Sequence, residues 1–479
     1  MFRIVNKGAL KRLQSNSSAP ASTAVPGSSC VAPQAACMST HAKGTPLFSC
    51  GLSKGVSNTT NRNQTTTSSS SRRHMASTSA STSASAKGTE DFFHYGKKKQ
   101  TAVSLKALME TGIGKRLDGA QNNGDGNHSD NDTPFKGATD KVKIQIACFL
   151  HRELPIRLAH RAADLANTAQ FKGNRHVENV ISWYRTSFKA LRACAAPTDI
   201  AKEEVFAKTL EDMYDRHSHT LITMAMAAHE LRQSMGSSID EFAAESAIQK
   251  SLDEFYHSRI GIRILIGQYL EIRKPKAEDD DPMMIGLISQ KCNVKEIALR
   301  AAADARYMCD RVHGDSPEIH IFGRTDLTFP YLPTHIEYML LELLKNSVRA
   351  TVEAHGIDNM PRIKIIIADS EDNEECVIKI SDEGGGIPRS NMNKIWSFLF
   401  TTADPAILES LLDEHRGPDF SLSSPLAGLG YGIPIARNFC RYFGGDLTIM
   451  SMEGYGTDSY IYLPKLREAQ LERRDYLVK

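Results

Sequence analysis

Four polar side chains recur at intervals of three and four residues in the segment HIEYMLLELLKNSVRATVEAH: Glu342, Asn346, Arg349 and Glu353. Residues at these intervals share one face of a helix. The oxygen of an asparagine can bind Mg²⁺, which prefers oxygen ligands and takes few of them from protein. A glutamate one turn away can accept the proton of an attacking hydroxyl. The stripe therefore suits a metal-nucleotide site, and the alternative for this helix alone is a solvated face.

A second candidate site lies in the segment CVIKISDEGGGIP, whose first part has the composition of a strand that ends at Asp382. A carboxylate at the end of a strand can accept a hydrogen bond from an exocyclic amine. Gly384 and Gly386 follow, and glycines allow the backbone to approach a flat base closely. The segment predicts a pocket for a nucleotide base, with a glycine-rich hairpin turn as the alternative.

Two further glycine segments come later in the chain. In PLAGLGYGIPIAR, Gly428, Gly430 and Gly432 precede a helix that we expect to begin near residue 433. Glycines that lead into a helix present backbone N–H groups to phosphate, although this spacing alone is weak evidence. In EGYGTDSYIYL, the Gly-Thr pair that ends at Thr457 lies in a turn before the last strand.

The order of the four segments is more specific than any one of them. A helix with E-x-x-x-N, then D-x-G-x-G, then G-x-G-x-G, then G-T resembles the Bergerat-type nucleotide fold shared by gyrase, Hsp90 and histidine kinases (the GHKL superfamily). We therefore predict that the chain binds ATP.

Two kinds of element must position these residues. From residue 142 to about 272 the apolar periodicity is helical, and four long helices joined by short polar breaks predict an up-and-down bundle. After about residue 290, strands mix with helices expected at 333–354 and 433–443, which predicts an α/β sandwich with a mixed sheet. The predicted fold is thus multidomain, a four-helix bundle followed by a Bergerat-type domain. The predicted parts are a tail at 1–90, the bundle at 91–285 with a flexible insert at 118–140, the nucleotide domain at 286–468 and a tail at 469–479.

Composition excludes several classes of protein. The 479 residues are 41% hydrophobic and 24% charged, as in soluble globular proteins, and the formal charge of +2 gives no reason to expect nucleic acid. Nine cysteines without a C-x-x-C pair argue against a disulfide framework or a zinc site, and fit a reducing compartment. No run approaches eighteen apolar residues, so we expect no membrane span.

The first 89 residues contain no Asp or Glu, and Ser, Thr and Ala dominate them. The opening MFRIVNKGALKRLQS can form a helix with apolar residues on one side and basic residues largely on the other. These features are typical of a mitochondrial or plastid transit peptide, with a plain disordered tail as the alternative.

The motif segments together resemble one family. ELLKNSVRATVE, ISDEGGGIPRS, FLFTTA, PLAGLGYGIPIARNFCRYFGGDL and SMEGYGTDSYIYL are similar to the catalytic domain of mitochondrial pyruvate dehydrogenase kinases and of the related branched-chain 2-oxoacid dehydrogenase kinases. The helical segments FLHRELPIRLAHR and FYHSRIGIRILIGQ resemble that family's bundle, and the likeness runs from about residue 91 to 466. The resemblance implies a matrix protein-serine kinase that uses ATP and Mg²⁺ and inactivates its target.

The resemblance also implies roles at matching positions. Glu342 would be the general base toward the substrate serine, and His217 would assist by polarising it. Asn346 would hold Mg²⁺, and Asp382 would bind the adenine amine. The remaining nucleotide contacts would be Arg349, Gly384, Gly386, Thr401, Thr402, Gly428, Leu429, Gly430, Tyr431, Gly432 and Thr457. The family also binds K⁺ near the nucleotide, with the backbones of Phe400 and Gly430 as contributors here.

The expected partners are the decarboxylase α subunit and the lipoyl-bearing core of a 2-oxoacid dehydrogenase complex, with a homodimer expected. The chain departs from the animal enzymes in three places. Its tail lacks the Asp-Trp pair that tethers the tails of a dimer, its lid at 403–425 differs from theirs, and its 118–140 insert has no counterpart.

The segments YGIPIAR and RYFGGDL resemble the pyruvate-directed branch of the family, whereas FTTA resembles the branched-chain kinases. A third alternative is a histidine autokinase, because the box around His229 mimics a phosphoacceptor site.

Overall fold

The computed structural model describes residue 92 and residues 94–114, 137–276, 281–369, 375–403 and 428–465. All of them belong to one compact unit of the chain. The predicted transit peptide, the C-terminal tail, most of the 118–140 insert and nearly all of the 403–425 lid lie outside the described residues.

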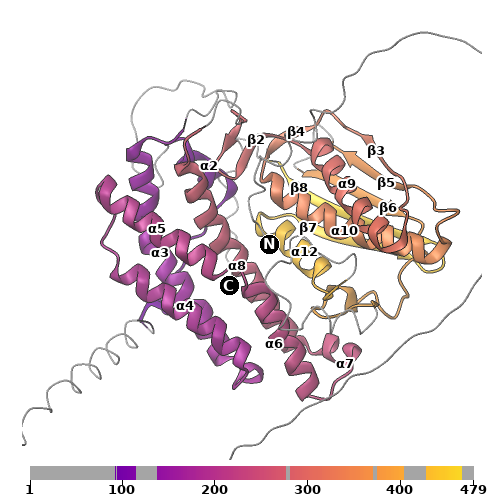
Figure 1. Ribbon diagram of the computed structural model, residues 1–479, viewed down its shortest axis with the longest axis horizontal. Helices are drawn as coiled ribbons and strands as arrows, with labels where there is room; N and C mark the ends of the chain where they lie inside the picture. Colours follow the sequence, from indigo (N-terminus) through magenta and orange to yellow (C-terminus); the bar gives the residue numbers. More distant parts are fainter. Residues whose placement is uncertain are drawn as a thin grey trace, which may run out of the picture. The chain divides into compact units, whose positions relative to one another are not determined.

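The first part of the described chain is helical (Figure 1). Side chains cap several helices at their first turn: Thr139 accepts from the amide of residue 142, Asn174 from residues 176 and 177, and Asp199 from residue 202. Such caps satisfy amides that have no partner inside the helix. The helices are α2 (Leu105–Gly112), α3 (Asp140–Asn167), α4 (Arg175–Ala193), α5 (Ile200–Arg216), α6 (Thr220–Ser234), α7 (Ile239–Ala244) and α8 (Ser246–Arg273).

One of the four helices predicted for this part is divided in two. The segment 203–233 covers most of α5 and α6, which are separated by a turn at 217–219. The carbonyl of His217 accepts from the amide of Thr220, three residues on, and from Nη2 of Arg259 at 3.4 Å. In a continuous helix that carbonyl would accept from the amide four residues on. The buried arginine of α8 thus gives this carbonyl a second donor, a tertiary contact that apolar periodicity does not report.

The second part contains a mixed five-stranded sheet in the order β3-β5-β6-β8-β7, in which β3 and β5 are parallel and the other neighbours antiparallel. A small antiparallel sheet has the order β1-β2-β4. The mixed sheet confirms the predicted α/β character. The strands are β1 (Met284–Ile285), β2 (Ile288–Asn293), β3 (Ile319–Gly323), β4 (Thr328–Tyr331), β5 (Ile363–Ala368), β6 (Glu375–Asp382), β7 (Asp446–Met452) and β8 (Gly456–Pro464).

Helices α9 (Val294–His313), α10 (Pro333–His355) and α12 (Gly432–Tyr442) cover one face of this sheet (Figure 1). Alternate residues of β5 and β6 are buried toward them, as a half-covered sheet requires. On the other face, Lys379 of β6 pairs with Asp458 of β8 at 2.8 Å. The sheet therefore fixes which residues at the ends of β6 and β8 lie next to α10.

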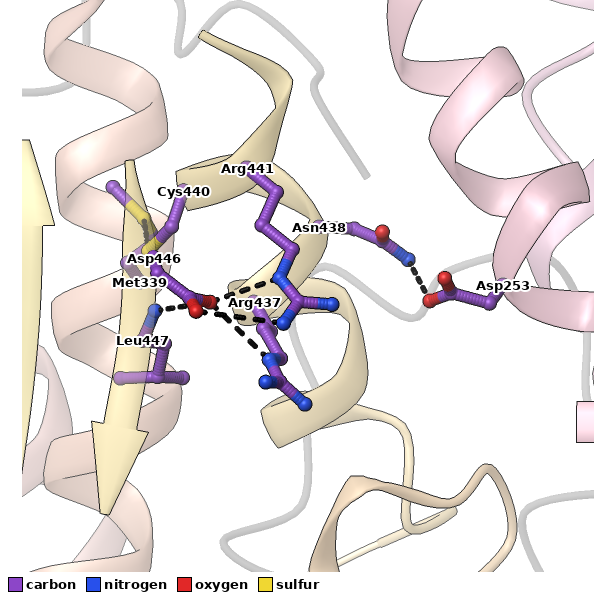
Figure 2. A network of polar contacts seen from close by, with 8 residues as sticks. All are labelled: Asp253, Met339, Arg437, Asn438, Cys440, Arg441, Asp446 and Leu447. Carbon is purple, nitrogen blue, oxygen red and sulfur yellow. Dashed lines mark hydrogen bonds and ion pairs between the residues drawn. The ribbon is translucent and has the colours of Figure 1, made fainter. Parts of the chain in front are cut away.

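Helix α12 is bonded to elements on two sides (Figure 2). Arg437 and Arg441 both contact Oδ1 of Asp446, at the start of β7, at 3.3 and 2.9 Å. On the other side, Asn438 donates to Oδ1 of Asp253 in α8 at 2.9 Å. The position of α12, and of the glycine segment before it, therefore depends on both parts of the chain.

The predicted domain boundary at 285/286 lies between two paired strands, because Ile285 of β1 pairs with Ile288 of β2. The small sheet thus connects the end of the helical part to the α/β part. Among the described helices, none is both long and apolar enough to cross a membrane.

Candidate active site

Helix α10 presents one polar and one apolar face. Leu340, Leu343, Leu344 and Val348 are buried in the core. The opposite stripe is therefore turned outward: the Glu342 side chain is 16% exposed and Asn346 is exposed. The predicted polar stripe is real, and core packing holds its direction.

The carboxylate of Glu342 lies between a lysine and a glycine. Nζ of Lys345, itself only 9% exposed, lies 2.8 Å from Oε1 of Glu342. A methyl group added at Gly432 would lie 2.5 Å from Oε2, which is closer than real contacts allow. The two oxygens thus have different neighbours, and the first residue of α12 must lack a side chain to approach the second.

Asp382 ends β6 and is 7% exposed. Oδ2 accepts from the hydroxyl of Ser347 on α10 at 2.7 Å, while Oδ1 accepts from the amides of Gly384 and Thr457 at 3.1 and 3.2 Å. Thr457 lies opposite Asp382 in the β6–β8 ladder. Burial raises the pKa of Asp382, and the hydrogen bonds from Ser347 and the two amides oppose that rise. This carboxylate is held by neutral dipoles.

The glycines after Asp382 allow close approaches that a side chain would prevent. A methyl at Gly384 would lie 2.6 Å from Cβ of Ala350 on α10. At Gly386, where φ is +72°, it would lie 2.2 Å from the carbonyl of Met452. These contacts bring the loop against α10 on one side and the end of β7 on the other.

The glycine segment before α12 lies against the segment that ends at Phe400. Gly430 has a φ of +69°, and a methyl there would lie 2.5 Å from the Phe400 carbonyl oxygen. The next side chain, Tyr431, is buried, with ring centroids 5.2 Å from Phe398 and 5.6 Å from Tyr256 of α8. Gly428 and Leu429, which precede them, are partly buried. An aromatic anchor thus fixes the end of the glycine segment next to Glu342.

Arg349 connects α10 to the threonine pair. Its Nη2 donates to Oγ1 of Thr402 at 2.7 Å, and its Nε lies 3.1 Å from Glu353. Oγ1 of Thr401 accepts from the amide of Ala403. The pair therefore lies at the edge of the same site, immediately before the lid.

The segment that leads to this pair is held by α8. Gln249 forms two hydrogen bonds with the backbone of Phe398: its Oε1 accepts from the amide at 2.7 Å, and its Nε2 donates to the carbonyl at 3.3 Å. The next residue, Leu399, has a φ of +67°, which is strained for a side chain of this size. The helical part thus stabilises a backbone shape that brings the Phe400 carbonyl to Gly430.

His217 lies in the helical part and is 5% exposed. Its Nε2 is 3.0 Å from Oγ of Ser187, and its ring stacks on Tyr184 with centroids 4.7 Å apart. Burial lowers the pKa of His217 to about 3, with a hydrogen bond to the Trp183 backbone acting in the opposite direction. Among the described residues, none of these contacts involves Glu342, so the assisting role expected for His217 stays a prediction.

The structure thus brings Glu342, Arg349, Asp382, Thr457 and the three predicted glycine segments to one region. Sequence reasoning missed Lys345, Ser347 and Gln249. The first two are on the helix that carries Glu342, at i+3 and i+5, so a Glu-x-x-Lys spacing could have indicated the ion pair. Nothing in the sequence connects Gln249 with a segment 149 residues away.

The class of protein follows from this geometry and from a family model. Residues 331–467 match the model described as histidine kinase-, DNA gyrase B-, and HSP90-like ATPase. This range contains α10, the strands β5 to β8 and the glycine segments. The α/β part is therefore an ATPase domain of the GHKL class, as predicted.

Known proteins narrow the class further. A mitochondrial [pyruvate dehydrogenase (acetyl-transferring)] kinase of Arabidopsis thaliana is 38% identical over 390 residues, which cover 80% of this chain and 95% of the relative. Its counterpart in Drosophila melanogaster is 36% identical over 335 residues, 67% of this chain and 77% of the relative. The human isozyme 3 is 35% identical over 336 residues, 68% of this chain and 79% of the relative. Residues 129–289 match the model described as mitochondrial branched-chain alpha-ketoacid dehydrogenase kinase. The chain belongs to the family of mitochondrial pyruvate dehydrogenase kinases.

Proposed function

We propose that this chain is an ATP-dependent protein-serine kinase that phosphorylates the decarboxylase α subunit of the pyruvate dehydrogenase complex and inactivates it. The single observation that carries the chemistry is the approach of Gly432 to Glu342, which places a carboxylate next to the glycine segment expected at the phosphates. The names of the relatives support the target. A branched-chain 2-oxoacid dehydrogenase is the second candidate target, because the family model that matches residues 129–289 is described by the name of the branched-chain kinase.

The base of ATP would bind at Asp382. A carboxylate offers about four acceptor sites, and three of them are used by Ser347 and the amides of Gly384 and Thr457. The remaining site, on Oδ2, suits an exocyclic amine such as that of adenine. Because the bonded oxygens cannot rotate away, the pocket would be formed before the nucleotide arrives.

The phosphates would lie between α10 and the start of α12, with the amides of residues 428–432 directed toward them. Asn346 is exposed one turn after Glu342 on the same helix. Its side-chain oxygen would be a ligand of the magnesium ion that binds the phosphates. Bound Mg²⁺ would neutralise charge on the transferring phosphoryl group. Among the described residues, we assign this ion one neutral protein ligand, which fits an ion held mainly by the substrate.

Glu342 would take the proton of the substrate serine. As the serine O–H bond breaks, that oxygen forms a bond to the γ-phosphorus, the bond to the β-phosphate oxygen breaks, and its electron pair leaves with ADP. Positioning supplies most of the rate in phosphoryl transfer. The buried leucines of α10 and the contact with Gly432 provide it here.

Other features of the proposal rest on the resemblance. A K⁺ ion would bind near the Phe400 carbonyl, which approaches Gly430. The kinase would form a homodimer, act in the mitochondrial matrix and dock on the lipoyl-bearing core of its complex. The location agrees with the mitochondrial names of the relatives.

The deciding experiment is a transfer assay with radiolabelled ATP on two purified decarboxylases, the pyruvate and the branched-chain enzyme. We expect faster serine phosphorylation of the pyruvate decarboxylase, with a parallel loss of its activity. Faster phosphorylation of the branched-chain enzyme would show that it is the target, and the proposed serine-kinase chemistry would stand. Acid-labile phosphate on His229, with neither decarboxylase modified, would show a histidine autokinase and overturn both the proposed target and the proposed chemistry.

A further inference from the structure

Lys345 is a buried lysine inside the proposed site. Its side chain is 9% exposed, and its ammonium group donates to Oε1 of Glu342 at 2.8 Å. A buried ammonium group is costly unless it is paired and hydrogen-bonded. Because Lys345 lies three residues after Glu342 on α10, both groups are carried by one rigid helix. Their pairing therefore depends on the helix and not on a loop.

The pairing divides the two oxygens of Glu342 between different tasks. Oε1 is occupied by Lys345, while Oε2 faces the backbone of Gly432 at the start of α12. An ammonium group bonded to one oxygen of a carboxylate restrains the last torsion of the side chain. The other oxygen is then directed to one place, and that place borders the segment expected at the phosphates.

The neighbours of this pair come from three elements. On α10 itself, Tyr338 lies one turn before Glu342, and the carboxylate contributes to raising the pKa of its buried hydroxyl. From α8, Arg259 acts on Tyr338 in the opposite direction. From α12 the backbone of Gly432 approaches Oε2 of Glu342. Within the described residues, Lys345 is the cation that bonds directly to Glu342.

We propose that Lys345 is a positioning residue for phosphoryl transfer: by binding Oε1 of Glu342, it directs Oε2 to accept the serine proton. This inference rests on the proposed function, because it assigns an oxygen to the proposed base. Lys345 does not touch ATP in this role. Its loss should therefore lower kcat and leave nucleotide affinity unchanged.

The test uses the full-length chain with four substitutions: Lys345→Met, Lys345→Arg, Glu342→Gln and the double variant Glu342→Gln/Lys345→Met. We expect Lys345→Met to lower kcat about 10- to 100-fold, the effect of a small misplacement of a reacting group. The dissociation constant for ATP, measured by calorimetry, should change by less than about 3-fold, a difference below 1 kcal/mol. Lys345→Arg should restore part of kcat relative to Lys345→Met, because a permanent positive charge with N–H donors for Oε1 remains.

The double variant separates positioning from folding. If Lys345 acts through Glu342, the second substitution should add nothing to the loss caused by Glu342→Gln. An equal additional loss in that background, or a parallel fall of kcat, ATP affinity and melting temperature, would overturn the proposal and leave a structural lysine. The matched control is Lys364→Met on β5, where the lysine is half exposed and 3.8 Å from Glu383; it should behave as the unsubstituted protein does.

The outcomes also distinguish this inference from the function on which it rests. Unchanged kcat in Lys345→Met, together with an inactive Glu342→Gln, removes only the role of Lys345. Full activity in Glu342→Gln removes the proposed base, and the oxygen assignment with it.

Discussion

The proposed site has two ends, each built around a carboxylate, and the chain treats the two groups differently. At the β6–β8 end, Asp382 is 7% exposed and accepts hydrogen bonds from a hydroxyl and two amides. At the α10–α12 end, Glu342 is 16% exposed and bonds to an ammonium group, with its second oxygen left beside a glycine. The first environment is neutral and nearly complete, and the second is charged and open on one side.

The difference indicates what each end can do. Fixed neutral donors hold a carboxylate in one orientation and leave it one acceptor site, which suits recognition of a base that does not react. A carboxylate with one restrained and one open oxygen suits a proton that must move. Each of the following substitutions tests this division, in order of decreasing expected effect.

Glu342→Gln should lower phosphoryl transfer by about 10²- to 10⁴-fold, because an amide cannot accept the serine proton. ATP binding should persist, since the nucleotide contacts assigned to the other end are intact. Radiolabelled phosphate incorporation measures the first quantity, and calorimetry the second. Phosphoryl transfer at the rate of the unsubstituted protein would show that Glu342 does not accept the proton, and the two carboxylates would then have no separate roles.

Asp382→Ala should have the complementary effect and weaken ATP binding roughly 10- to 150-fold, as expected for the loss of a hydrogen bond to a charged group worth about 1.5–3 kcal/mol. The control is Asp458→Ala, which removes a carboxylate from the strand paired with β6 but from the face that carries Lys379. Calorimetry on both variants provides the comparison. Equal affinities would move the base pocket away from Asp382.

Gly432→Ala should lower kcat about 10- to 100-fold, because the added methyl would lie 2.5 Å from Oε2 of Glu342 and displace it. The comparison variant is Gly314→Ala at the end of α9, where no atom lies within 4 Å but φ is +88°. That variant should lose about 1 kcal/mol of stability and keep its activity. If both lost activity alike, the loss would reflect folding and not the contact with Glu342.

Substitution of His217 tests whether a residue of the helical part contributes to phosphoryl transfer. The unfolded chain takes up a proton below about pH 6.5, whereas folded His217, with its pKa lowered to about 3, does not. Its share of stability is therefore present above pH 6.5 and is lost as the pH falls toward 3, by about 1.4 kcal/mol per pH unit. His217→Gln should flatten this acid dependence in urea unfolding, and its effect on kcat tests the assisting role expected for His217: a change below about 3-fold would remove that role. A 100-fold loss of kcat would extend the catalytic region to His217.

Asp382→Asn should give the smallest effect, a change in how the stability of the fold depends on pH. Burial raises the pKa of Asp382, so the folded chain binds a proton at this carboxyl more tightly than the unfolded chain does. This contribution is complete below the pKa of the unfolded chain and is lost as the pH rises through the folded value. Relative to the asparagine variant, the unsubstituted protein without nucleotide should therefore become less stable between acid and neutral pH. A constant difference across that range would show that the neutral donors fully offset burial.

Much of the second part of the fold could be predicted from sequence. Helix α10, helix α12 and strands β5 to β8 follow the expected segments, because a strong period or a glycine break defines each. The prediction did not include α9 or the short strands β1 to β4. The turn that divides α5 from α6 was not predicted either; there the His217 carbonyl accepts from Arg259, which is remote in sequence.

The site was predictable to a similar degree. Glu342, Asp382 and the glycines carry motif information because their spacing is local. That Oε2 faces Gly432, a residue 90 positions later, is a property of packing that no spacing reports. Likewise, His217 shares a sequence motif with its family, but its burial beside Tyr184 is visible only in three dimensions.

The two hydrogen bonds between the Gln249 side chain and the Phe398 backbone, here called the clamp, make the shape of the α/β part depend on α8. The left-handed backbone of Leu399 costs about 1–3 kcal/mol, and two hydrogen bonds from α8 help to hold it. A fragment that begins after α8 would lack the clamp and the Tyr256 ring that covers Tyr431. The strands of the fragment could still pair, but the backbone at residues 398–400, which lies against the glycine segment, would lose its fixed shape. A chimera that borrows this domain should therefore carry α8 with it.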